Sequence, residues 1–80
     1  MAWRVLDNGG EVWHVQAVAE MRPQEKVWQL VLSFRERSSE NRRVFWADYP
    51  LESSSKTSLF HAADKIPDET LRQVIAQHLS

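Results

Sequence analysis

Residues 11–37 read EVWHVQAVAEMRPQEKVWQLVLSFRER, and most of the fold can be inferred from them. Apolar residues alternate along this stretch, at odd positions up to Met21 and at even positions from Trp28 onward. Alternation with a period of two is typical of strands that bury one face. Pro23 interrupts the pattern, and proline suits a turn because it cannot donate to a neighbouring strand. Residues 11–37 therefore predict two antiparallel strands joined by a turn.

The apolar residues of these two strands must share one face of the sheet, because opposed residues of a hairpin point to the same side. A loop of even length achieves this, such as four residues at 22–25. The shared face comprises Trp13, Val15, Ala17, Ala19 and Met21 with Trp28, Leu30, Leu32 and Phe34. We expect this face to form the core and the other, mixed face to stay open.

A shorter strand is expected before this hairpin, at residues 3–7. The sequence Asn-Gly-Gly follows it at residues 8–10, a strong turn signal because Asn and Gly accept positive φ. A three-residue loop at 8–10 would set Val5 against Trp13 and gather the large residues on one side. A two-residue turn at 8–9 would mix the two faces, so we predict the three-residue loop.

A fourth strand is expected at about residues 42–49, after a turn at 38–41, and it should end before Pro50. The sequence does not decide which face of this strand is buried, because either Val44 and Trp46 or the set Phe45, Ala47 and Tyr49 could point inward. Short connections place consecutive strands side by side. The strand order should therefore be 1-2-3-4, with every pair antiparallel.

The C-terminal third changes to helical spacing. Leu59, Ala62, Ala63 and Ile66 predict a short helix at about 55–64. Pro67, Asp68 and Glu69 then form a good helix start, with proline first and acids near the positive end of the dipole. The apolar stripe of this last helix comprises Leu71, Val74, Ile75, His78 and Leu79. We expect it to pack on the aromatic sheet face, where small side chains at Ala17 and Ala19 would allow a close approach.

These patterns predict an α+β fold, a four-stranded antiparallel β-meander in order 1-2-3-4 with a C-terminal helix, preceded by a short helix, packed on one face. The 80 residues suit a single domain, 1–80, with the meander at about 3–49 and the helical part at about 55–79. Four Trp residues help so short a chain to fill a thin core.

Composition narrows the class of protein. The formal net charge is −1, from 10 Lys and Arg against 11 Asp and Glu, which argues against a dedicated nucleic-acid binder. The chain has no Cys, so disulfides, thiolate nucleophiles and cysteine metal sites are excluded. The sequence offers no apolar segment of membrane-spanning length. We expect a cytoplasmic protein that does not enter a membrane.

Catalytic motifs are weak. Ser53 and Lys56 have the S-x-x-K spacing of serine acyl-enzymes, but a serine loop ending in a helix N-cap explains the same residues more simply. His14, His61 and His78 are far apart in sequence and form no H-x-H or H-x-x-x-H pair, as a zinc site would favour. We therefore expect no catalytic residue, no metal and no cofactor.

Two binding hypotheses remain, with a small enzyme or enzyme subunit as a further alternative. The favoured hypothesis is a non-enzymatic module that binds an unidentified protein or a second copy of itself. In the second case, a homodimer would form through the open sheet face. Its candidate residues are Val12, His14, Val18 and Val31.

The alternative is a weak nucleic-acid binder that uses an arginine patch beside aromatic residues. The patch comprises Arg35, Arg37, Arg42 and Arg43. Glu36 and Glu40 lie among these arginines and reduce the local excess of positive charge. A solvated hairpin tip with ion pairs across the strands is the more economical interpretation.

Overall fold

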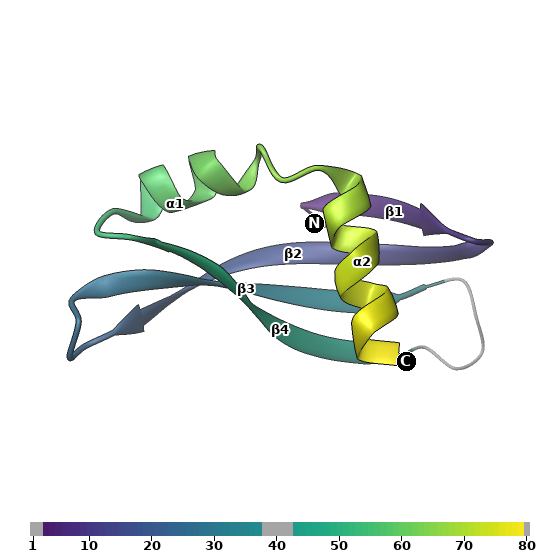
Figure 1. The fold of residues 1–80 in the computed structure, drawn as a ribbon, viewed down its shortest axis with the longest axis horizontal. Helices are drawn as coiled ribbons and strands as arrows, with labels where there is room; N and C mark the ends of the chain where they lie inside the picture. The colour runs from purple at the N-terminus through teal and green to yellow at the C-terminus, as the bar shows by residue number, and fades with distance from the viewer. Residues whose placement is uncertain (1–2, 38–42, 80) are drawn as a thin grey trace.

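The computed structural model describes residues 3–37 and 43–79. This part of the chain forms strands β1 (Arg4–Asn8), β2 (Glu11–Arg22), β3 (Val27–Glu36) and β4 (Val44–Ser53), then helices α1 (Lys56–Ala63) and α2 (Asp68–Leu79). The strands make one antiparallel sheet in the order β1-β2-β3-β4, as predicted. In Figure 1, the short β1 lies beside one half of β2, α1 lies toward the other half, and α2 runs across the strands.

The core lies between one sheet face and the two helices. Its buried members are Leu6, Trp13, Val15, Leu30, Leu32, Phe34, Phe45, Leu59, Ala63, Ile66, Leu71 and Ile75. Phe45 settles which face of β4 is buried, because its ring stacks on Phe34 at 4.7 Å and meets Trp13 edge-on at 5.8 Å between centroids. His78 of α2 stacks on the same ring at 3.8 Å. The predicted aromatic face is therefore the core face, and Leu71, Val74 and Ile75 of the helix stripe pack on it. Leu79 of the predicted stripe and Met21 of the predicted face are exposed instead, at 39% and 42%.

The predicted register of the first hairpin is wrong. Leu6 pairs with Trp13 and Asn8 with Glu11, so the loop is two residues, Gly9 and Gly10. Both glycines have positive φ, 61° and 90°, as a type I′ turn requires and as the right-handed twist of the strands favours. This register buries Leu6 and turns Val5 outward, the reverse of the expectation.

The second hairpin keeps the predicted pairing of faces but not the predicted loop. Val15 pairs with Phe34 and Ala19 with Leu30, so the apolar faces of β2 and β3 coincide. The loop nevertheless covers residues 23–26, one residue later than expected, because Arg22 still pairs with Val27. The amides of residues 25 and 26 both donate to the carbonyl of Arg22, and these bonds close the turn.

β4 continues past Pro50, where the sequence predicted its end. The strand can do so because it is an edge strand and is bulged: Leu30 pairs with Tyr49, but Gln29 pairs with Glu52. The buried carboxamide of Gln29 fills the irregularity. Its Nε2 donates to the carbonyl of Tyr49 and lies 3.3 Å from that of Leu30 and 3.5 Å from that of residue 51.

Both helices begin next to residues that favour a helix start in the sequence. The Oγ of Ser55 accepts from the amide of Ser58 at 3.4 Å, which is the predicted N-cap of α1. Pro67 precedes α2, and its carbonyl accepts from the amide of Thr70 at 3.0 Å. Arg4 ties the helices to β1, because its guanidinium donates to the carbonyls of residues 63, 64 and 66 and pairs with Asp68 at 3.1 Å.

Candidate interaction surface

The open face is the sheet face opposite α1 and α2. It carries Val5 and Asp7 of β1, the even-numbered residues of β2, the odd-numbered residues of β3, and Val44, Trp46, Asp48 and Glu52 of β4. One row of paired residues crosses all four strands, Val5, His14, Arg35 and Val44. The next row is Gln16, Ser33 and Trp46. At this end of the face, apolar side chains on the edge strands therefore flank polar and basic side chains on the inner strands.

Three large apolar side chains project from the open face into solvent. Trp46 is 60% exposed, Val5 59% and Val44 52%. All three belong to the edge strands β1 and β4, and Val5 and Val44 stand at opposite ends of one row. Large exposed apolar side chains gathered on one face are typical of interaction surfaces.

The four residues that the sequence nominated for this surface do not contribute equally. Val12, His14 and Val18 are partly exposed, but Val31 is only 6% exposed. Val31 lies on the inner strand β3, between Val18 and Asp48, whose strands shield it on both sides. The side chain of Val31 therefore offers little surface to a partner in this structure, and its role as a contact residue stays a prediction.

Sequence reasoning missed Val5, Val44 and Trp46, the most exposed apolar residues of the open face. The missing signal for Val5 was the Gly9-Gly10 turn, which sets the register of the first hairpin. For Val44 and Trp46, the sequence left both orientations of the strand open. The pairing of Phe34 with Phe45 decides between them, because it puts Val44 and Trp46 on the opposite side.

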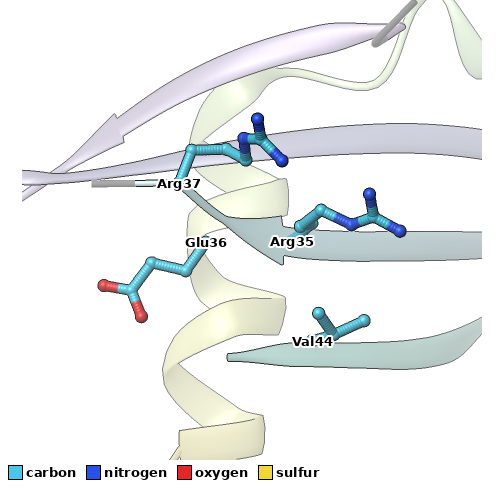
Figure 2. Close-up of a pocket in the computed structure, with 4 residues that line it drawn as sticks. All are labelled: Arg35, Glu36, Arg37 and Val44. Atoms are coloured by element: carbon cyan, nitrogen blue, oxygen red, sulfur yellow. The ribbon is translucent and has the colours of Figure 1, made fainter. Parts of the chain in front are cut away.

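The candidate basic patch is split between the two faces of the sheet. Arg35 and Arg37 are exposed, and with Glu36 and Val44 they line a pocket of about 300 Å³ at the end of β3. Figure 2 shows both guanidinium groups pointing away from the Glu36 carboxylate. Arg43 pairs with that carboxylate on the helix side, and Arg42 lies outside the described residues.

Arg43 takes part in a polar network at the edge of the core. Its Nε donates to Oε1 of Glu36 at 2.8 Å, and its Nη2 pairs with Oε2 of Glu11. The indole of Trp13 donates to the other Glu11 oxygen at 3.1 Å. The hydrogen bond to Glu36 raises the pKa of Arg43, with a smaller contribution from Glu11 and against an opposing effect of burial. These carboxylates hold the Arg43 side chain away from a ligand on the open face.

The other residues considered as catalytic or metal-binding candidates lie in different places. Lys56 lies over the ring of Trp28, 4.4 Å from its centroid, while Ser53 accepts a bond from the amide of Ser55 at 3.2 Å. His14 is on the open face, whereas His78 lies on the helix side, where its ring is exposed and stacks on Phe45. Within residues 3–37 and 43–79, no group of three His, Cys, Asp or Glu residues could hold a metal.

Comparison with protein-family models, with curated proteins and with solved structures gives no match. Both described helices are too short and too polar to cross a membrane. Function is therefore inferred from the chain's own residues.

Proposed function

We propose that the protein is a small interaction module that binds a second copy of itself through the open face. The exposure of Trp46 carries the proposal. A tryptophan that shares its strand with buried Phe45, yet keeps 60% of its surface in water, leaves much apolar area to be buried on binding. Tryptophan is also among the residues that contribute most to binding energy at protein interfaces.

The open face is large enough for a dimer. Strands of 5, 12, 10 and 10 residues, which rise about 3.4 Å per residue and lie about 4.8 Å apart, present roughly 600 Å² in projection. A standard protein interface buries about 800 Å² on each partner. A second copy that covered the whole open face would therefore reach the lower limit of stable interfaces, about 600 Å² on each partner. A two-fold dimer also needs a surface that is complementary to itself, which a mixed face of apolar and oppositely charged groups can supply.

Sedimentation equilibrium of the whole chain tests the proposal. We expect a concentration-dependent dimer, weakened at least about tenfold by Trp46→Lys because the substitution places a charge in the apolar contact. The matched control is Leu79→Lys, which changes a 39% exposed apolar residue of α2 and should leave the equilibrium unchanged. A monomer at all concentrations, or equal effects of the two variants, would contradict the proposal.

A second candidate function is binding of single-stranded nucleic acid, favoured by one observation. Trp46 opposes Ser33 and Arg35 opposes Val44, so Trp46 and Arg35 are diagonal neighbours on one face. An exposed ring beside a guanidinium can stack a base and contact its phosphate. Arg35→Ala with Arg37→Ala should then abolish salt-dependent binding of a labelled oligonucleotide, measured by fluorescence anisotropy. Absence of binding by the unmodified protein would remove this candidate.

We infer a cytoplasmic location from the absence of Cys, and this stays a prediction. Lys56 lies over the ring of Trp28, and a Ser53–Lys56 catalytic pair stays a weaker alternative.

A further inference from the structure

Charges on the open face are segregated toward its two ends. At one end, Arg35 and Arg37 are exposed. Within the described residues, the carboxylate at this end of the face is that of Asp7. At the other end, Glu20 and Glu52 are exposed on either side of Gln29. Asp48 lies nearby and pairs weakly with Arg22 at 3.7 Å. One end therefore carries an excess of guanidinium groups and the other an excess of carboxylates.

The two ends are far enough apart to act separately. Six residues of β3 separate Arg35 from Gln29, which corresponds to about 20 Å along an extended strand. This distance exceeds the screening length of about 8 Å at physiological salt. Between the ends lie Ser33, Val31 and the exposed ring of Trp46. The face thus has a basic end, which also carries Val5 and Val44, an acidic end, and the exposed ring of Trp46 between them.

We propose that two copies meet through their open faces with the sheet ends reversed, so that the basic end of each copy lies on the acidic end of the other. The two-fold axis then lies between the sheets and perpendicular to the strands. This inference rests on the proposed function and specifies its geometry. The rotation brings Arg35 and Arg37 of one copy toward Glu20 and Glu52 of the second copy, while the Trp46 side chains meet near the axis.

The alternative axis, parallel to the strands, is disfavoured by the same charges. It would place the guanidinium pair of one copy against that of the other, and the carboxylate pair of one copy against that of the other. Like charges opposed across an interface cost binding energy, and opposed unlike charges speed and orient association. The observed segregation therefore favours an axis perpendicular to the strands over an axis parallel to them.

Charge reversal at one end, followed by reversal at both, tests the geometry. The basic-end variant is Arg35→Glu with Arg37→Glu, and the full-swap variant adds Glu20→Lys and Glu52→Lys. All four positions are exposed, and circular dichroism verifies that each variant is folded. With reversed ends, the basic-end variant brings carboxylates against carboxylates and should dimerise about tenfold more weakly. The full swap restores unlike charges in every contact and should recover the original affinity.

Mixing the unmodified chain with the full-swap chain separates the two axes. Reversed ends predict that mixed dimers are disfavoured, because basic ends would then meet basic ends. An axis parallel to the strands predicts the opposite, a mixed dimer tighter than either homodimer, and that result would overturn the inference. If Trp46→Lys weakens the dimer while none of the charge variants changes it, the geometry falls and the proposed function stands. If the unmodified chain is monomeric, both fall.

Discussion

Trp46 and Ser33 oppose each other across β4 and β3 on the open face, yet Trp46 is 60% exposed and Ser33 only 7%. The difference follows from their places in the sheet. Ser33 lies on an inner strand with side chains on both sides, whereas Trp46 lies on an edge strand with neighbours on one side. The open face therefore offers its large apolar groups to a partner mainly from its edge strands, whereas Ser33 and Val31 of the inner strand β3 are buried.

Substitutions at Val31 and Trp46 should separate folding from association. Val31→Ala removes two methyl groups from a buried position and should lower the free energy of unfolding by about 2 kcal/mol. Trp46→Ala should change the stability of the monomer little but weaken the dimer. Urea unfolding at low protein concentration and sedimentation at high concentration measure the two quantities. Equal loss of monomer stability in both variants would show that Trp46 is part of the folded core.

The glycine turn provides a test of the first hairpin register. Gly10 has φ of 90°, and a Cβ added there would meet nothing within 4 Å beyond its chain neighbours, so only backbone strain opposes a side chain. Gly10→Val should destabilise the fold by about 1–2 kcal/mol in urea unfolding. Gly9→Asn should cost less, because asparagine tolerates the left-handed conformation. A neutral Gly10→Val would argue for a different loop.

The carboxamide of Gln29 should be required for the bulge beside Pro50. Gln29→Met keeps the length of the side chain but removes the donor to the carbonyl of Tyr49. Buried carbonyls then lose a partner, which should cost about 1–3 kcal/mol in thermal or urea unfolding. Gln16→Ser, at an exposed position of β2 on the same face, provides the control, with an expected change within about 0.5 kcal/mol. A Gln29→Met protein as stable as the original would contradict this role.

The ion pair between Arg43 and Glu36 predicts that substituting one partner destabilises the fold more than substituting the other. Arg43→Met leaves the carboxylate of Glu36, a residue only 1% exposed, without its guanidinium partner. Glu36→Gln leaves Arg43 partly exposed and still paired with Glu11. An uncompensated buried charge is the more costly defect, so Arg43→Met should lower the melting temperature more than Glu36→Gln. The reverse order, measured by differential scanning calorimetry, would show that Glu36 is accessible to water.

The sequence was sufficient for the element order, the shared face of β2 and β3, and the helix starts. Apolar residues recur with a period of two over Glu11–Arg22 and Val27–Glu36, which decides both the strands and their buried face. Ser55 and Pro67 have the chemistry of residues at helix starts. The first register was not predictable in the same way. Two adjacent glycines are compatible with loops of different length, and the loop length decides whether Val5 or Leu6 faces the core.

The open face was harder to predict than the core because exposure depends on which strands lie at the edges. Val31 has the strand pattern of a surface residue but is shielded by both neighbouring strands. Arg43 follows the other arginines in sequence but turns to the helix side to meet Glu36. Neither outcome can be inferred without the strand register, which only tertiary packing determines.

Isotope-filtered nuclear Overhauser spectroscopy on a mixture of labelled and unlabelled chains tests the central claim most directly, because it detects contacts between copies alone. Self-association through the open face predicts intermolecular contacts from the Trp46 indole to open-face side chains such as Val18 and Val44 of the second copy. Contacts confined to α1 and α2, or no intermolecular contact at concentrations where the chain is dimeric, would contradict it.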